Sequence, residues 1–298
     1  MSTSPYPAWV RGRLVAPGEP AIPADDEGLQ LGLSVFDTVL YERGMLLFLE
    51  RHLERFEGGL AELGISLPWE PTAALESYLA ALESERGALP ERLLLRLTAT
   101  RGNPAGGATL MVTARDAEDL PPGGVALALA RTHKAAGDPT EGIKSTNRLR
   151  NVLSREEARA RGAWEVLFTT TDGFLSEGSI SNLFLVLATE SGPVLHTPSL
   201  AQGCLAGITR DLVLEELANE PLVVDGRVIP VVVGELEVAS LETAVEAFLT
   251  NTSQRVLPVN RVLGTDGQVL TARLAVPGQV SEGVLGRILA AEQLYRSR

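Results

Sequence analysis

The segment EGIKSTNRLRNVLSREEARARG, residues 141–162, contains one of only two lysines in this chain of 298 residues. The sequence has 26 basic side chains, and all except Lys134 and Lys144 are arginines. An arginine keeps its proton in a protein, whereas a lysine can lose its proton and act as a nucleophilic amine. Lys144 lies in a small polar turn and is therefore a candidate for chemistry, with an ordinary surface lysine as the alternative.

A helix is expected after Lys144, because three apolar residues share one helical face: Leu149, Val152 and Leu153. Ser145 or Thr146 can cap this helix, and Gly162 can end it. The apolar run GVALALAR before the segment predicts a buried strand, so Lys144 is expected at a junction between strand and helix. The positive field at a helix N-terminus would favour the neutral amine that condenses with a carbonyl group.

The composition excludes several classes of function. A formal charge of -12 disfavours a nucleic-acid partner, which requires a basic surface. The N-terminus lacks the apolar stretch of a signal peptide, and no apolar run is long enough to cross a bilayer, so we expect a cytoplasmic protein without a membrane partner. A single cysteine and three widely separated histidines predict no disulfide and no metal site.

The segment DAEDLPPGG, residues 116–124, is the clearest domain boundary because charges, prolines and glycines interrupt strand-like sequence there. We therefore predict an α+β fold with two domains, residues 1–118 and 119–298. The first should contain strand-rich sequence at 33–49, two helices and a further strand, with one helix marked by an apolar stripe: Leu49, Leu53, Phe56, Leu60 and Leu63.

The second domain should contain a mixed sheet with helices. Two strand-like runs are joined by Asp172-Gly173, a strong hairpin signal. A helix is expected to begin after Gly207 in GITRDLVLEELAN, and AVEAFLTNTSQRVLPVNRV predicts a strand, a polar loop and a strand. The last helix should span about 280–296.

Glu177 is an acid in the otherwise apolar stretch FLSEGSISNLFLVL. It can be a turn residue that faces water, or a buried carboxylate. A buried carboxylate needs a partner, and the protonated nitrogen of a pyridine ring is one such partner. Both interpretations remain open at the level of the sequence.

Two further stretches are suited to a phosphate group. GCLAGITRD places backbone N–H groups and the Thr209 hydroxyl at a helix start, where an anion is stabilised. LTNTSQ contains short hydrogen-bond donors between two strands. Arg55 could add a cation, although its position lies off the apolar face of its helix, where a solvated side chain is the alternative.

The order of the motifs resembles the class IV, or fold-type IV, family of pyridoxal-phosphate aminotransferases. The motifs are, in order along the chain, ERHLERF, GIKSTNRL, LSEGSISNLF, GITRD and LTNTSQRVLPV. The resemblance extends over nearly the whole chain. It implies a small N-terminal α+β domain and a larger C-terminal domain with pyridoxal 5'-phosphate between them, in a homodimer whose partner chain helps to wall the site.

The resemblance also implies roles for individual residues. Lys144 would hold the cofactor, and Glu177 would contact the pyridine nitrogen and keep it protonated. The phosphate would be bound by four residues, with Ile208 acting through its backbone: Arg55, Ile208, Thr209 and Thr252.

Three activities occur in this family: branched-chain aminotransferase, D-amino-acid aminotransferase and 4-amino-4-deoxychorismate lyase. KSTNRLRNVL is most similar to the lyase, and Asn251 in FLTNTS and Arg101 in TATRG favour the same activity. Arg148 and Arg101 are candidates to bind the two carboxylates of that small-molecule substrate. Two segments, LGLSVFDTV and NPAGGAT, depart from the family pattern. These departures affect the expected substrate contacts more than the expected cofactor site. An aminotransferase remains the alternative.

Overall fold

The computed structural model describes residues 5–119, 121, 123–271 and 274–297, which form two compact units. Unit 1 comprises Met1–Glu118 and Ile143–Asn147, and unit 2 comprises Asp119–Gly142 and Arg148–Arg298. The division between Glu118 and Asp119 lies in the DAEDLPPGG segment, of which residues 120 and 122 lie outside the described part. The α+β class expected from the sequence is confirmed.

The described part of unit 1 contains an antiparallel sheet of six strands in the order β2-β1-β6-β5-β3-β4. Its strands are β1 (Ala8–Val10), β2 (Arg13–Val15), β3 (Ser34–Glu42), β4 (Met45–Leu46), β5 (Arg92–Asn103) and β6 (Gly107–Asp116). Strand β3 pairs with β5 along its whole length, from Ser34 opposite Thr100 to Glu42 opposite Arg92. This long pairing fixes the position of β3, which carries site residues.

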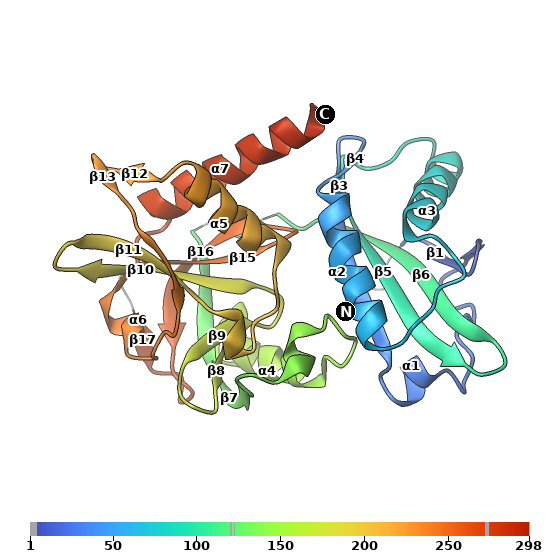
Figure 1. The fold of residues 1–298 in the computed structure, drawn as a ribbon, viewed down its shortest axis with the longest axis horizontal. Helices are drawn as coiled ribbons and strands as arrows, with labels where there is room; N and C mark the ends of the chain where they lie inside the picture. Colours follow the sequence, from blue (N-terminus) through green and yellow to red (C-terminus); the bar gives the residue numbers. More distant parts are fainter. Residues whose placement is uncertain (1–4, 120, 122, 272–273, 298) are drawn as a thin grey trace. The chain divides into compact units, whose positions relative to one another are not determined.

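Helices α2 (Leu49–Glu62) and α3 (Pro71–Arg86) pack on the sheet of unit 1, and a short helix, α1 (Glu27–Gln30), precedes β3 (Figure 1). The predicted apolar stripe of α2 is confirmed, because Phe56 and Leu60 are buried against Leu95 and Leu97 of β5. Helix α3 adds Tyr78 and neighbouring apolar residues to the same core.

The described part of unit 2 contains a mixed sheet of nine strands in the order β14-β11-β10-β15-β16-β7-β8-β9, with β17 paired to β16. Strand β9 also pairs with β10, so six strands form a closed ring in the order β10-β15-β16-β7-β8-β9. The strands are β7 (Val125–Lys134), β8 (Glu165–Thr170), β9 (Leu175–Gly178), β10 (Asn182–Thr189), β11 (Gly192–Pro198), β14 (Val231–Gly234), β15 (Ala244–Asn251), β16 (Arg255–Leu263) and β17 (Val269–Thr271). Two short strands, β12 (Val223–Val224) and β13 (Arg227–Val228), form a separate hairpin.

Alternating side chains of these strands enter different cores. Leu127 of β7 belongs to one buried cluster, whereas Ala126 and Ala128 face the cluster that packs on α4 (Leu149–Ala160). The opposite helical layer is formed by α5 (Ile208–Asn219) and α7 (Gln279–Arg296), which pack together and on β15 (Figure 1). Three shorter helical segments complete the unit: η1 (Pro139–Gly142), η2 (Leu200–Gln202) and α6 (Ser240–Thr243).

Several local predictions for this unit are confirmed. The turn at Asp172-Gly173 joins the antiparallel strands β8 and β9, and Gly207 is the N-cap of α5. The strand, loop and strand expected at 244–262 are β15 and β16. None of the described helices is both long and apolar enough to span a membrane.

The segment Ile143–Asn147 is assigned to unit 1, although the sequence placed it in the second domain. The amide of Phe36 donates a hydrogen bond to the Lys144 carbonyl at 2.9 Å, and the amide of Thr146 donates to the Ser34 carbonyl at 3.1 Å. The segment is thus attached to β3 by strand-like pairing. The chain leaves unit 2 after η1, pairs with β3 and returns to unit 2 as α4.

The predicted cap of the helix after Lys144 was wrong. Helix α4 begins at Leu149 with Arg148 as its N-cap, and it has no capping hydrogen bond from a side chain. Ser145 instead pairs with Val35, and the Thr146 hydroxyl is hydrogen-bonded to that of Ser34. Since the field of a helix end acts mainly within its first turn, α4 does not provide the expected field at Lys144.

Candidate active site

Lys144 is held by unit 1 as part of the short segment that pairs with β3. Its backbone is fixed on both sides by the hydrogen bonds to Phe36 and Ser34, and its Nζ atom lies 4.7 Å from the centroid of the Phe36 ring. The residue is half-buried. A lysine with a fixed backbone and a partly exposed side chain can present its amine to a carbonyl compound.

A buried cluster of charges lies on the same strand and on helix α2. The Asp37 carboxylate accepts hydrogen bonds from Arg55 Nε and Nη2, each at 2.8 Å, and lies 2.8 Å from Nδ1 of His52. Asp37 is fully buried, and the Arg55 side chain is 14% exposed. Arg55 is therefore oriented by a bidentate ion pair and is not a solvated side chain.

The charges in this cluster affect one another. Burial raises the pKa of Asp37, but Arg55 and His52 outweigh burial and leave that pKa below its ordinary value. Burial lowers the pKa of His52, Asp37 opposes this effect, and the positive charges of Arg55 and Lys144 add to the lowering. The imidazole is thus held neutral near pH 7, which leaves Arg55 as the cation of the buried cluster.

Arg101 also belongs to unit 1. Its side chain is 48% exposed, and its Nε atom lies 3.3 Å from a carboxylate oxygen of Glu27 in α1. An exposed guanidinium in a loose ion pair can exchange its partner for another carboxylate at small cost. Its role as a substrate contact stays a prediction.

Glu177 of β9 is buried, which excludes the interpretation of this residue as a turn residue that faces water. Its Oε1 accepts a hydrogen bond from Lys134 Nζ at 2.5 Å. Its Oε2 accepts from Asn182 Nδ2 and from the Leu205 amide, each at 3.0 Å. A carboxylate offers about four acceptor positions, so among the described residues one position on Oε1 remains for a further donor.

Asn182 connects Glu177 with the two polar stretches predicted to bind phosphate. Asn182 pairs in register with Thr250 across strands β10 and β15. A Cβ atom at Gly207, the N-cap of α5, would lie only 1.9 Å from Asn182 Oδ1, so this position requires glycine. The carboxylate, the start of α5 and the end of β15 therefore come together in unit 2.

The start of α5 and the loop after β15 present several hydrogen-bond donors. No side chain caps α5, and the amides of its first turn, including those of Ile208 and Thr209, have no partner within the helix. Among the described residues, Thr250 Oγ1 and Asn251 Nδ2 are buried without a hydrogen-bond partner. Thr252 follows in the same loop. This combination of a helix N-terminus and unpaired donors suits an anion.

Asn251 also shapes its own loop. Its Oδ1 accepts hydrogen bonds from the amides of Ser253 and Gln254, at 3.0 and 2.8 Å. The carbonyl group of the side chain thus fixes the turn, and its amide group is directed elsewhere. A role for Asn251 in substrate binding is compatible with this arrangement but stays a prediction.

Arg148 lies at the start of α4 in unit 2, where its guanidinium donates a hydrogen bond to the Ser179 carbonyl. Burial lowers the pKa of Arg148, whereas Glu177 and Glu165 oppose this effect. An arginine keeps its charge under such conditions. Arg148 therefore places a positive charge near Glu177, and its contact with a substrate carboxylate stays a prediction.

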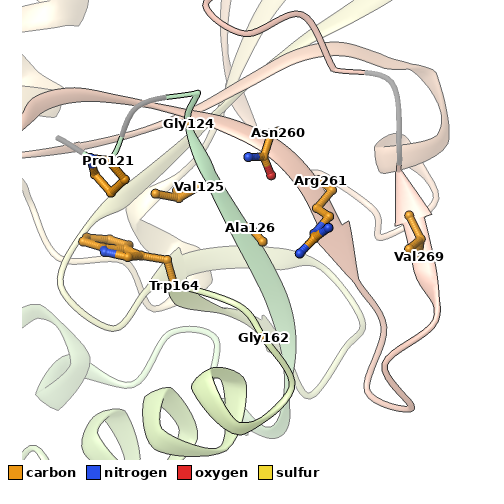
Figure 2. A pocket seen from close by; sticks show the side chains of 9 residues that line it. All are labelled: Pro121, Gly124, Val125, Ala126, Gly162, Trp164, Asn260, Arg261 and Val269. Atoms are coloured by element: carbon orange, nitrogen blue, oxygen red, sulfur yellow. The ribbon is translucent and has the colours of Figure 1, made fainter.

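A surface hollow of about 550 Å³ lies elsewhere in unit 2. Figure 2 shows its lining side chains, which include Trp164 and Pro121 on one side of β7 and Asn260 and Arg261 on the other. It contains no lysine and none of the predicted site residues. The hollow therefore does not coincide with the site that the sequence predicts.

The model of the family described as "Amino-transferase class IV" matches residues 34–262, which include the Lys144 segment, Glu177, the start of α5 and the loop after β15. The chain belongs to the class IV aminotransferase family. Members of this family depend on pyridoxal phosphate, as the resemblance of the motifs implied.

Individual relatives cover three activities. The chain is 29% identical to a D-alanine aminotransferase of Bacillus licheniformis over 282 residues, 92% of each chain. It is 27% identical to an aminodeoxychorismate lyase of Bacillus subtilis over 267 residues, which cover 85% of this chain and 86% of the relative. A solved branched-chain aminotransferase of Thermoproteus uzoniensis with norvaline has 27% identity and a TM-score of 0.76, and the alignment covers 94% of this chain and 92% of that one.

The residues present in this class IV enzyme fit pyridoxal 5'-phosphate. Lys144 offers an amine for the aldehyde group, and Glu177 has an acceptor position for a protonated ring nitrogen. The unpaired donors of Thr250 and Asn251 and the first turn of α5 suit the phosphate group. The aldehyde, the ring nitrogen and the phosphate of the cofactor thus each have a chemically matched partner in the chain.

The sequence did not single out Lys134, Asn182 or Asp37 as site residues. Lys134 ends the run GVALALARTHK, where a lysine after a buried strand was the only available signal. Asn182 occurs in the quoted motif LSEGSISNLF, but its connecting role depends on the pairing of β10 with β15.

Glu165 leads to a prediction on pH dependence. This fully buried carboxylate accepts hydrogen bonds from the Ser179 hydroxyl at 2.6 Å and the Val166 amide at 2.8 Å. Burial raises its pKa above the ordinary value, against the opposing effects of Arg155 and these hydrogen bonds. The folded state therefore holds this proton to a higher pH than the unfolded state, and stability is lost as pH rises from about 4.5 through the raised pKa.

The variant Glu165→Gln removes this titration. We expect the free energy of unfolding of the variant to increase relative to that of the wild type as the pH rises from 4.5 to 7.5, so that the variant becomes relatively more stable. Urea denaturation at several pH values measures this difference. Glu242→Gln, at an exposed position, is the control and should show no such trend. A difference that is constant with pH would contradict the prediction.

Proposed function

We propose that this class IV enzyme uses pyridoxal 5'-phosphate as a 4-amino-4-deoxychorismate lyase, which produces 4-aminobenzoate and pyruvate for folate synthesis. The observation that carries the proposal is the motif Lys144-Ser-Thr-Asn147-Arg148-Leu, which is most similar to the lyase. The substrate is a small molecule, and the enzyme is expected in the cytoplasm.

The structure gives the asparagine of this motif a physical role. Asn147 Nδ2 donates a hydrogen bond to the Gly32 carbonyl at 3.1 Å. Gly32 has a φ of +72°, and a Cβ atom there would lie 1.9 Å from Asn147 Oδ1. The asparagine thus packs closely on the turn before β3 and supports the segment that carries Lys144.

The proposed roles of the chain's residues follow from their chemistry. When bound, pyridoxal phosphate supplies an electron sink for the carbon that bears the substrate amine. Lys144 would take the proton from that carbon and supply a proton to the methylene carbon of the enolpyruvyl group, whose bond from the ring carbon to oxygen would break so that the group leaves as pyruvate. Glu177 accepts a hydrogen bond from the protonated ring nitrogen. Arg148 and Arg101 are proposed to bind the two substrate carboxylates, since guanidinium groups match them in charge and shape.

The cofactor lysine is tested by chemical labelling. Borohydride reduction of the cofactor-loaded protein should add a pyridoxyl mass to the peptide that contains Lys144, which mass spectrometry identifies. Lys144→Arg keeps the positive charge and should remove the label, whereas Lys134→Arg should keep it. A label on Lys134 in the wild type would assign the cofactor to the other lysine.

The reaction type is tested by its stoichiometry. A lyase regenerates the aldehyde form of its cofactor in each cycle, so aminodeoxychorismate alone should yield equal amounts of 4-aminobenzoate and pyruvate. Arg148→Ala should raise the required substrate concentration by about tenfold or more, because a charge-assisted hydrogen bond is lost. If D-alanine or L-leucine reacts only with added 2-oxoglutarate and aminodeoxychorismate is unchanged, the protein is an aminotransferase.

We also propose that the enzyme forms a homodimer through α4. Leu149 is 72% exposed and Leu153 is 55% exposed in the single chain, with Val152 beside them on the same face of the helix. A cluster of exposed apolar side chains at helical spacing indicates a contact surface. A second copy of the chain is the partner that the family resemblance implies.

The double variant Leu149→Gln with Leu153→Gln tests this surface. Burial of each leucine at an interface contributes about 1.5–3 kcal/mol, so the dimer dissociation constant should rise by about 100-fold or more. Sedimentation velocity over a range of protein concentrations measures this change. Leu294→Gln, at a 59% exposed position in α7, is the matched control. A monomeric wild type, or an unchanged dimer in the double variant, would contradict the proposed interface.

A further inference from the structure

Lys134, the second lysine of the chain, is almost completely buried at the end of β7, with an exposure of 2%. Its Nζ atom contacts three oxygen atoms. These belong to Glu177 at 2.5 Å, to the carbonyl of Gly203 at 2.6 Å and to Glu141 at 3.3 Å. An ammonium group has three N–H donors, so each of them has an acceptor.

Removing an ammonium group from water is costly, and an apolar side chain of similar size would avoid this cost. A lysine nevertheless occupies this buried position, in a chain whose other basic side chains are arginines except for Lys144. Its amine is buried against three oxygen atoms and is therefore poorly placed to react with a carbonyl group. The arrangement indicates an electrostatic role.

We propose that Lys134 is a positioning residue that holds Glu177 as an ionised hydrogen-bond acceptor for the ring nitrogen of the cofactor. This inference rests on the proposed function of Glu177. Lys134 occupies one position on Oε1, while Asn182 and the Leu205 amide bind Oε2. The carboxylate is thereby fixed in orientation, with its remaining acceptor position on Oε1.

The position of the charge favours a proton on the ring nitrogen and not on Glu177. A cation stabilises a carboxylate that it touches and repels a protonated ring nitrogen, and both effects fall with distance. Lys134 contacts Oε1 of Glu177 directly, whereas a donor at the remaining position of the same oxygen lies farther from the ammonium group than this oxygen does. The attraction therefore exceeds the repulsion, and Lys134 stabilises the ionised pair as a whole.

Lys134 also connects Glu177 with two helical segments of unit 2, η1 and α4. Glu141, in η1, contacts Lys134 and forms an ion pair with Arg150 of α4. Arg150 Nη1 donates a further hydrogen bond to the His133 carbonyl at 3.2 Å. Glu141, Arg150 and Lys134 all belong to unit 2, so this network joins η1 and α4 to the strand that ends at Lys134.

The experiment compares the affinities of two cofactors for the full chain after its own cofactor has been removed. One is pyridoxal 5'-phosphate, and the other is its 1-deaza analogue, in which C–H replaces the ring nitrogen. Their affinity ratio isolates the contact of the nitrogen with Glu177, because all other contacts are shared. The wild type should prefer pyridoxal phosphate by about tenfold or more, as expected for a hydrogen bond between charged groups.

Lys134→Met should reduce this ratio to within about threefold of one, and Lys134→Arg should restore most of it. Glu292→Gln is the matched control, because it removes a buried ion pair with Arg255 in the same unit and should leave the ratio unchanged. If Lys134→Met does not fold, Lys134→Gln keeps a hydrogen-bond donor without the charge and gives the same test.

The two proposals fail in different ways. If the wild type does not distinguish the two cofactors, Glu177 does not bind the ring nitrogen, and the proposed role of Glu177 fails together with the inference. A second outcome has three parts: the wild type distinguishes the two cofactors, Glu177→Gln loses the preference, and the neutral Lys134 variants keep it. In that case only the inference is overturned. An equal loss of affinity for both cofactors in those variants would show that Lys134 acts on the fold alone.

Discussion

The carboxylate of Glu177 is buried, and several parts of unit 2 supply the groups that stabilise it. An ionised carboxylate in a protein interior is costly unless charges and hydrogen bonds compensate it. The donors come from three places: Lys134 at the end of β7, Asn182 at the start of β10 and the amide of Leu205 before α5. Because strands β7, β8, β9 and β10 lie in one continuous sheet, the closure of β9 on β10 brings these groups to one point.

The same junction organises the phosphate-binding candidates. Asn182 contacts Glu177 with its side-chain amide, stands opposite Thr250 in the sheet and packs against the glycine that begins α5. A larger residue at Gly207 would collide with Asn182, and the helix start could not approach so closely. The Glu177 carboxylate and the donors at Thr250 and at the start of α5 are thus all held by contacts with Asn182, as the orientation of a single cofactor would require.

A second structural feature concerns the segment that carries Lys144. The crossover from β7 to β8 contains α4, as in other parallel strand connections, but it also contains the short segment that pairs with β3 of unit 1. Buried Asp37 orients Arg55 on the neighbouring helix, so the cations of unit 1 occupy defined positions on and beside β3. Relatives with three different activities have similar identities to this chain, so the overall identity does not distinguish between these activities.

The sequence by itself determined the α+β class, most local elements and the family. The apolar stripe of α2, the hairpin at Asp172-Gly173 and the glycine at the start of α5 are local signals, because periodicity and turn chemistry act over a few residues. Only the tertiary structure decided that Glu177 is paired with Lys134, 43 residues away, and that residues 143–147 pair with β3. Such contacts depend on which strands are neighbours and on their register, and neither is encoded in the spacing of residues along a single segment.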